Sequence, residues 1–222
     1  MADLVLEAAA SNAGWCDAVC RALGLPTQWT ADAWSAARRS PDGYPDAVTL
    51  SPLAHAASML SLVDSRPGCS IKDSFAVLDL EPSGFHVLFE ATWIRRPGIV
   101  GGSTATLDWH RVQTPADLEQ WSAGHGLDVF VPAMLDDDSL RFYRTGPGTG
   151  AGFALSRHGD VVGASNLYPG SADPDTVWSD LIAVAAQAYP GLDLVGYESG
   201  ADLEAALSVG FAGIGPLRVW IR

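Results

Sequence analysis

The chain has 222 residues, a length that fits one large domain or two smaller ones. Its formal net charge of −13 repels phosphate backbones and anionic lipid, so we expect neither nucleic-acid nor membrane partners. With 48% hydrophobic and 18% charged residues, the composition is that of a globular protein. No apolar run approaches the roughly 20 residues that span a bilayer. The acidic first residues do not match an export signal, so we expect a cytoplasmic protein.

The three cysteines, Cys16, Cys20 and Cys69, cannot all pair with one another. A cytoplasmic setting also keeps thiols reduced. Cys16 and Cys20 share one helix face and supply two possible metal ligands, but no CxxC or HxxxH pattern completes a zinc site. We therefore predict three free thiols and no bound metal.

The N-terminal segment, to about residue 43, predicts a helical flank. Apolar residues recur at helical spacing from Trp15 to Leu23, and the sequence GLP then ends the helix. Trp29 and Trp34 follow in a second short amphipathic piece, which we also expect to be helical.

The next segment alternates strand and helix signals. Residues 46–50 are an apolar strand, and Ser51 with Pro52 begins a helix with an apolar stripe. Residues 70–80 and 84–94 alternate polar and apolar positions on either side of the turn sequence PSG. These two segments predict a β-hairpin.

A Pro/Gly/Ser/Thr-rich stretch between residues 95 and 106 has the composition of a linker. We therefore expect two domains, residues 1–96 and residues 107–222. The elements predicted in the second are a strand at 107–112, a helix capped by Thr114, strands at 140–145, 152–158 and 161–168, a long helix after Asp173, a strand at 192–197, a short helix to Gly210 and a strand at 215–221. Strands and helices alternating in this way predict an α/β fold with mixed sheets flanked by helices.

The end of the chain carries a resemblance to a known family. The sequence LVGYESGADLEAALSVGFAGIGPLRVW, residues 194–220, resembles the strand, short helix, "GF" and last strand of the GNAT superfamily of acyl-CoA-dependent N-acyltransferases. The resemblance covers about residues 107–222. Residues 46–96 look like a shortened copy of the same unit, which implies two GNAT-like halves with the first reduced.

The resemblance implies where an acyl-CoA would bind. In the family the pantetheine arm pairs with the strand that corresponds to residues 161–168, and the pyrophosphate lies at the start of the following helix. Acetyl-CoA or another acyl-CoA is therefore the implied cofactor. The implied cofactor-binding residues are Val162, Gly163, Ala164, Ser165, Asn166, Gly170 and Ser171.

The sequence departs from the family pattern at two places. The pyrophosphate loop lacks the usual Arg or Gln and the second glycine, Pro169 and Pro174 remove two N–H donors, and Asp173 and Asp175 add negative charge. The tyrosine that many members use as general acid is replaced by Ala206. We therefore predict weak binding of CoA.

Glu198 is the predicted catalytic residue, because a carboxylate at the end of its strand would lie where an acceptor amine loses its proton. Apolar walls would raise its pKa towards neutrality. A surface carboxylate that flanks a helix is the alternative interpretation. The predicted substrate contacts are Lys72, which is the only lysine of the chain, Asp73, Trp93 and Tyr197.

These features together predict an N-acyltransferase that moves an acyl group from an acyl-CoA-type thioester to an amine on a small molecule. Two alternatives stay open at this point. The chain could be a catalytically degenerate GNAT-like module that binds a ligand or a protein, or a GNAT-like fold reused for chemistry without CoA.

Overall fold

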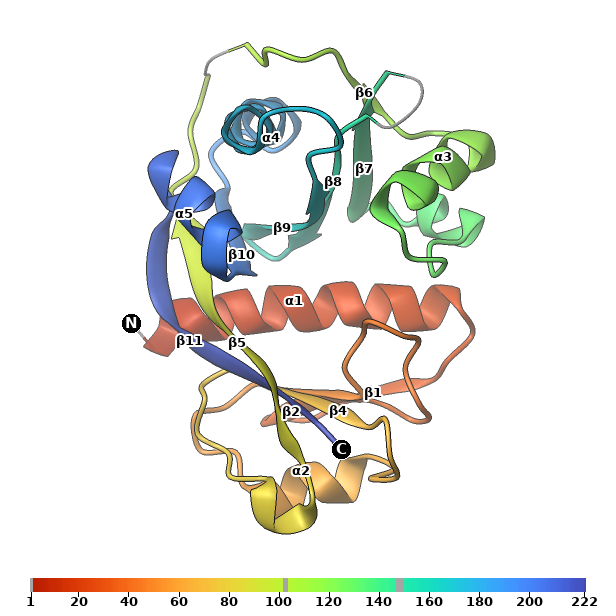
Figure 1. Ribbon diagram of the computed structural model, residues 1–222, viewed down its shortest axis with the longest axis vertical. Helices are drawn as coiled ribbons and strands as arrows, with labels where there is room; N and C mark the ends of the chain where they lie inside the picture. Colours follow the sequence, from red (N-terminus) through yellow and green to blue (C-terminus); the bar gives the residue numbers. More distant parts are fainter. Residues whose placement is uncertain (1, 102–103, 147–149) are drawn as a thin grey trace. The chain divides into compact units, whose positions relative to one another are not determined.

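The computed structural model describes residues 2–101, 104–146 and 150–222 (Figure 1). The chain divides into two compact units. Unit 1 comprises Met1–Trp93 with Ile214–Arg222, and unit 2 comprises Ile94–Gly213. The long strands β5 and β11 each contribute residues to both units.

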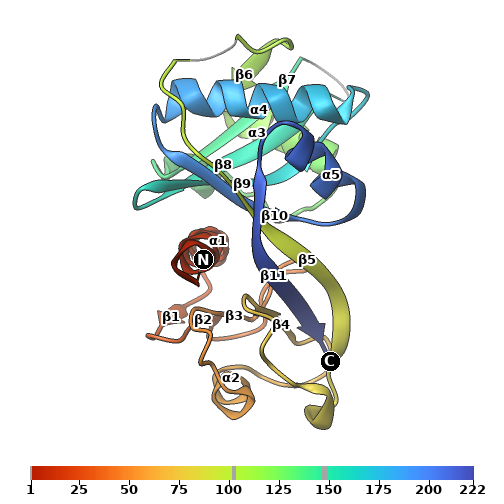
Figure 2. The same cartoon turned by 90° about the vertical axis from the view of Figure 1, so that its left-hand side faces the viewer.

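Unit 1 contains most of the first half of the chain. Its elements are α1 (Ala2–Ala22), β1 (Thr27–Trp29), β2 (Ala33–Ala36), β3 (Ala47–Thr49), α2 (Ala56–Leu62), β4 (Ser70–Asp73), the 3-10 helix η1 (Glu81–Ser83), most of β5 (His86–Arg96) and most of β11 (Ala212–Ile221). The strands follow one another in the order β1-β2-β3-β4-β11-β5. Helices α1 and α2 lie on opposite faces of this sheet (Figures 1 and 2).

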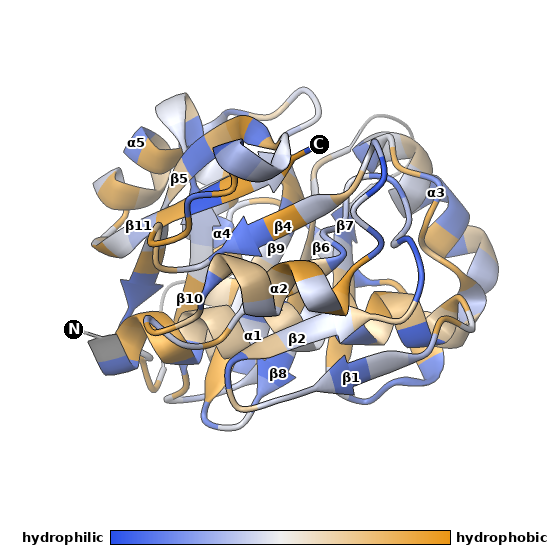
Figure 3. Cartoon of the chain, turned by 90° about the horizontal axis from the view of Figure 1, so that it is seen from below, coloured by the Kyte–Doolittle hydropathy of each residue, from blue (hydrophilic) through white to orange (hydrophobic). Residues whose placement is uncertain are grey.

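The α2 face of unit 1 encloses a small apolar core. Met59 of α2 packs with Ile71 of β4 and Trp220 of β11, and all three are buried. Helix α2 is drawn mostly in the orange and pale tones of apolar residues in Figure 3. Met59 is the buried residue of α2, and its apolar contact with the sheet compensates for the weak stability of so short a helix.

The segment after α1 forms strands, so the expectation of a second helical piece there was wrong. Strands β1 and β2 pair antiparallel, with Trp29 opposite Trp34. The reason is a buried carboxylate on α1: Asp17 accepts hydrogen bonds from the indole N–H groups of Trp29 and Trp34, at 3.2 and 2.9 Å. Burial acts to raise the pKa of Asp17, but the hydrogen bonds from Thr27 and Trp34 hold it below its ordinary value.

The predicted hairpin of residues 70–80 and 84–94 was also wrong. Strand β4 ends at Asp73, whose carboxylate accepts hydrogen bonds from the backbone N–H of Phe75 and Leu78. A left-handed residue, Ala76 with φ of 53°, lies in this turn. Strand β11 then lies between β4 and β5 and pairs antiparallel with β4. A strand from the far end of the sequence therefore replaces the expected local partner.

Unit 2 contains the remaining elements. They are β6 (Trp109–Arg111), α3 (Pro115–His125), the 3-10 helix η2 (Pro132–Asp136), β7 (Leu140–Thr145), β8 (Gly152–His158), β9 (Val161–Tyr168), α4 (Pro174–Ala188), β10 (Asp193–Glu198) and α5 (Gly200–Ser208). The strands follow the order β6-β7-β8-β9-β10, and the C-terminal end of β5 lies beside β10. Strands β6 to β9 form an antiparallel meander, whereas β9 and β10 are parallel.

The sheet of unit 2 separates two clusters of side chains. On one face, Phe153 and Val162 pack against Trp178 of α4 in the main apolar core. On the other, Phe142 of β7 meets Trp121 of α3 edge-on, with ring centroids 5.0 Å apart. Neighbouring residues of a strand point to opposite faces, so the alternation along β7 to β9 sends α3 and α4 to different sides.

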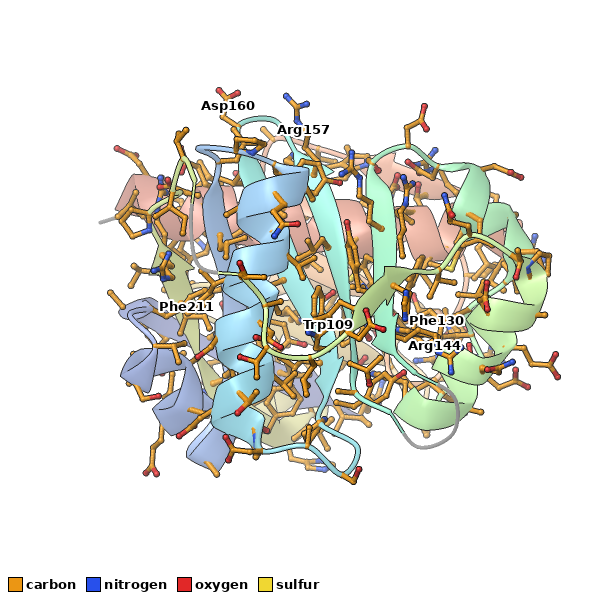
Figure 4. All side chains as sticks on the ribbon, turned by 90° about the horizontal axis from the view of Figure 1, so that it is seen from above. Trp109, Phe130, Arg144, Arg157, Asp160 and Phe211 are labelled. Atoms are coloured by element: carbon orange, nitrogen blue, oxygen red, sulfur yellow. The ribbon has the colours of Figure 1, made fainter. Side chains whose placement is uncertain are left out.

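A buried carboxylate fixes the chain where it enters the sheet of unit 2. Asp180 of α4 accepts hydrogen bonds from the backbone N–H of Thr106 and Leu107 and from the indole N–H of Trp109, at 2.7 to 2.9 Å. Trp109 lies beside α4 in Figure 4. Residues 102 and 103 of the expected linker lie outside the described residues.

The units differ in one respect from the expected domains. The first boundary in the structure, between Trp93 and Ile94, lies close to the expected end at residue 96. The last strand, which we expected in the second domain, has most of its residues in unit 1. No helix among the described residues is both long enough and apolar enough to cross a membrane.

Candidate functional site

The parallel strands β9 and β10 pair over only three residues. The pairing runs from Val161 with Asp193 to Gly163 with Val195, although both strands continue further. Continued at the same register, it would set Asn166 opposite Glu198. The last residues of the two strands therefore have backbone N–H and C=O groups that do not pair between β9 and β10. They lie at the carboxyl ends of the parallel strands, where functional groups often gather.

A β-bulge distorts β9 just beyond the last paired residue. Strand β9 has two residues, Asn166 and Leu167, where its other neighbour β8 has only Phe153. Asn166 adopts a left-handed conformation with φ of 54°. A bulge leaves one residue without a ladder partner and bends its strand. The predicted cofactor-binding residues Val162 to Asn166 lie in the part of β9 that runs up to and into this bulge.

Glu198 lies at the end of β10 in a desolvated position. Burial, and to a smaller extent the charge of Asp202 on α5, raise the pKa of Glu198 to about 8. Among the described residues its carboxylate has no hydrogen-bond or ion-pair partner. The pKa has the direction expected from the sequence. A carboxyl that titrates near neutral pH can accept a proton from a bound molecule. Tyr197, which precedes it on β10, is partly exposed.

The N-terminus of α4 is already occupied by a carboxylate of the chain itself. Asp173 caps the helix by accepting the backbone N–H of Thr176 at 3.0 Å, and Pro174 occupies the first turn without an N–H. The preceding turn holds the predicted contacts Gly170, with φ of 56°, and Ser171. This end of α4 therefore offers an anion fewer donors than an uncapped helix does.

An aromatic cluster joins the end of β9 to α3. Tyr168 donates its hydroxyl to the carbonyl oxygen of Trp121 at 3.2 Å, and burial raises the pKa of Tyr168 to about 12. Two glycines leave room for its ring. A Cβ atom on Gly124 would lie 2.8 Å from the ring, and one on Gly152 would overlap with it. The position of α3 is thereby tied to the bulged end of β9.

A cavity of about 620 Å³ adjoins this cluster on α3. The residues that line it are Pro115, Ala116, Leu118, Glu119, Ser122, Ala123, Gly126, Leu127, Asp128, Phe130 and Pro132. Phe130 lies on the α3 side of the unit in Figure 4. Among the described residues the Ser122 hydroxyl is buried without a hydrogen-bond partner. The cavity has mostly apolar walls and two exposed carboxylates, and its volume is that of a small-molecule site.

The other predicted substrate contacts are interior residues of unit 1. Lys72 is 3% exposed and donates from Nζ to Oδ1 of Asn12 at 2.7 Å. The Asp73 carboxylate is held by the turn that ends β4. Trp93 donates its indole N–H to the carbonyl oxygen of Ser74 at 2.8 Å. Each polar group thus bonds to the protein itself, and a role in binding substrate stays a prediction for all three.

The cysteines are all free and buried. Burial is the main cause that raises the pKa of Cys16 and of Cys69 to about 12, so neither is a reactive thiolate at neutral pH. Within residues 2–101, 104–146 and 150–222, no three His, Cys, Asp or Glu side chains gather as a metal site would require.

Sequence reasoning missed the contribution of α3. The cavity residues Glu119, Ser122 and Asp128 carry no motif, and their grouping depends on how the chain turns after His125. The one signal was the pair of glycines that face Tyr168, but a glycine in a sequence does not show which side chain needs the space.

Comparison with solved structures places this geometry in a known fold. A GCN5-related N-acetyltransferase from Kribbella flavida matches over 94% of this chain and 94% of its own, with a TM-score of 0.57 and 12% identity. An acetyltransferase from the GNAT family of Novosphingobium aromaticivorans matches over 92% and 96%, with a TM-score of 0.53 and 13% identity. No protein-family model matches the sequence, and no curated protein does. The expected fold class is confirmed, while a reduced first copy stays a prediction.

The raised pKa of Glu198 predicts a pH-dependent stability. The folded carboxyl has a pKa of about 8, whereas the unfolded one loses its proton near the ordinary glutamate pKa of 4.5. The folded state therefore binds more protons in this window, and stability falls as pH rises through it. Relative to Glu198→Gln, the wild type should lose on the order of 1 kcal/mol per pH unit between these values.

Urea unfolding of both proteins between pH 4 and pH 9 measures this difference. Glu204→Gln, an exposed change on α5, is the matched control and should follow the wild type at every pH. A constant difference between wild type and Glu198→Gln across the range would contradict the raised pKa.

Proposed function

We propose that the protein is an acyltransferase that moves an acyl group from an acyl-CoA to an amine on a small molecule. The observation that carries this proposal is the open end of the β9–β10 pair, where the bulge at Asn166 and the desolvated carboxyl of Glu198 lie on adjacent strands. The fold shared with N-acetyltransferases supports acyl transfer in general. The acyl-CoA donor and the small-molecule amine acceptor are our finer proposals.

The reaction needs one proton acceptor and a place for the thioester. The acceptor nitrogen attacks the thioester carbonyl carbon, a C–N bond forms, the C–S bond breaks, and the thiolate leaves. Backbone groups of β9 between Ala164 and Asn166 would hold the donor, because the pairing of β9 with β10 ends at Gly163 and Asn166 lies in the bulge. Donors fixed in this way stabilise charge on the carbonyl oxygen without reorganising.

Glu198 would take the proton that the amine loses. An amine that arrives as an ammonium ion must be deprotonated before it attacks, and a base with a pKa near the working pH does this best. The ammonium ion would itself favour the ionised carboxylate of Glu198. The proton then passes to solvent or to the departing thiolate, so that the product thiol balances the reaction.

The cavity on α3 would hold the acceptor. Its apolar walls suit the body of a small molecule, and Glu119 and Asp128 suit a positive group. The overall charge of −13 acts in the same direction, because it attracts cations from solution. A small primary amine with an apolar body fits these features.

One observation favours a second candidate function, in which the protein catalyses a reaction or binds a ligand without CoA. The N-terminus of α4, which would receive the pyrophosphate, carries Asp173 as its own cap and has Asp175 in its first turn. Both carboxylates repel a phosphate. Binding of CoA therefore decides between the two candidates.

Replacing Glu198 by Gln should lower kcat for acyl transfer by at least about tenfold, since a general base contributes about 10²–10⁴-fold. The wild-type rate should rise with pH and reach half of its maximum at about pH 8, the pKa of Glu198. Asp202→Asn should move this midpoint to lower pH, because it removes a repelling charge. Steady-state rates from pH 6 to pH 9 test both effects, with Glu204→Gln as control. Unchanged turnover in Glu198→Gln would exclude this role.

Neutralising the start of α4 should strengthen CoA binding. The double change Asp173→Asn and Asp175→Asn keeps a capping side chain but removes two negative charges, so affinity for acetyl-CoA should rise several-fold. Calorimetric titration of wild type and variant measures it, and Asp160→Asn, in the turn between β8 and β9, is the control. If neither protein binds acetyl-CoA, the CoA-independent candidate takes precedence.

Filling the cavity should block the acceptor but not the donor. Ala123→Trp adds bulk to a residue that lines it, so KM for the amine should rise at least about tenfold while the affinity for acyl-CoA stays unchanged. Gln120→Trp, on α3 but outside the cavity, is the matched control. Equal kinetics in the two variants would place the acceptor elsewhere.

A further inference from the structure

Strand β5 exposes a run of apolar side chains on a sheet edge. Val87, Leu88 and Phe89 are 37%, 52% and 38% exposed, and His86 and Glu90 beside them are also exposed. The full strand order places β5 between β11 and β10, and among the strands of unit 1 it is the last. Apolar residues on both faces of an edge strand are unusual, because such an edge pairs readily with another chain.

The rest of β5 has partners, so the open edge is short. The described contacts between β5 and β10 fall further along, where Ile94 lies next to Gly196 and Arg95 pairs with Asp193. Towards β11, Glu90 accepts hydrogen bonds from Arg218 at 2.8 and 3.0 Å. Figure 2 draws the first part of β5 on the outer side of β11, and the side chains of residues 86–90 are exposed there.

The sequence of this edge complements itself in one antiparallel register. With Leu88 opposite Leu88 of a second copy, Val87 lies opposite Phe89 and His86 lies opposite Glu90. Apolar residues then face apolar residues, and an imidazole faces a carboxylate. A register centred on Glu90 instead of Leu88 would place the Glu90 carboxylates of the two copies opposite each other, which is unfavourable.

We propose that two copies of this chain pair through β5, antiparallel, about a two-fold axis at Leu88. A second copy is the partner that the edge itself specifies, because a two-fold contact requires a segment that matches its own reverse. Five residues bury much less than the roughly 1,200 Å² of a stable interface, so the dimer is weak. Two chains of charge −13 also repel each other, so added salt strengthens it.

Cysteine cross-linking tests the register directly. In Leu88→Cys the two new thiols lie opposite each other at roughly 4.5–5.5 Å between Cα atoms, within reach of a disulfide. In Val87→Cys the equivalent residues are diagonal neighbours at roughly 7–8 Å and cannot bridge without backbone movement. The native cysteines are buried, and the oxidised wild type controls for them.

We expect Leu88→Cys to form a covalent dimer under mild oxidation at least about tenfold faster than Val87→Cys, because only its thiols are within disulfide range. Sedimentation of the wild type should show a dimer that grows with concentration and with salt and that Leu88→Lys abolishes. Equal cross-linking in the two cysteine variants would overturn the register. A wild type that stays monomeric at all concentrations, or one whose β5 edge binds an extended peptide instead, would overturn the dimer.

Discussion

The candidate site depends on the point at which β9 and β10 stop pairing. After Gly163 and Val195 the two strands share no ladder, although Gly196 still lies against the carbonyl oxygen of Ala164, where a Cβ atom would come within 2.9 Å. Only glycine, which has no Cβ atom, allows the two backbones to remain this close just past their last paired residues. The bulge at Asn166 then bends β9 beyond the last residue that pairs with β10. The desolvated carboxyl of Glu198 lies at the end of β10, three residues beyond its last pair with β9.

In each unit a buried carboxylate fixes the chain next to the strands. Asp17 collects indole and hydroxyl donors from the first strands, and Asp180 collects two amides and an indole where the chain enters unit 2. Each replaces water with several fixed donors, which is how a protein keeps a charge inside. Glu198 has none of these donors and therefore holds its proton to about pH 8. The contrast separates carboxylates that support structure from one that can exchange a proton.

Local patterns predicted the strands of the second half well. The alternation at residues 140–145, 152–158 and 161–168 matches β7, β8 and β9, and Thr114 caps α3 as its position before a proline indicated. These elements depend on neighbours in sequence. The hairpin at residues 70–94 failed because β11, more than 120 residues away, pairs with β4. The helix expected around Trp29 and Trp34 failed because Asp17 binds both indoles, which pattern reasoning does not detect.

The sequence by itself determined the acidic charge, the fold class and Glu198 as the carboxyl at the end of its strand. Composition, periodicity and a strand–helix–strand pattern are local properties, and each can be read along the chain. Only the tertiary structure decided that Lys72, Asp73 and Trp93 bond within unit 1, that α3 and Phe130 line a cavity, and that residues 86–90 are exposed on the last strand of unit 1. Those features arise from contacts between segments far apart in sequence, which are set by how the sheets and helices pack.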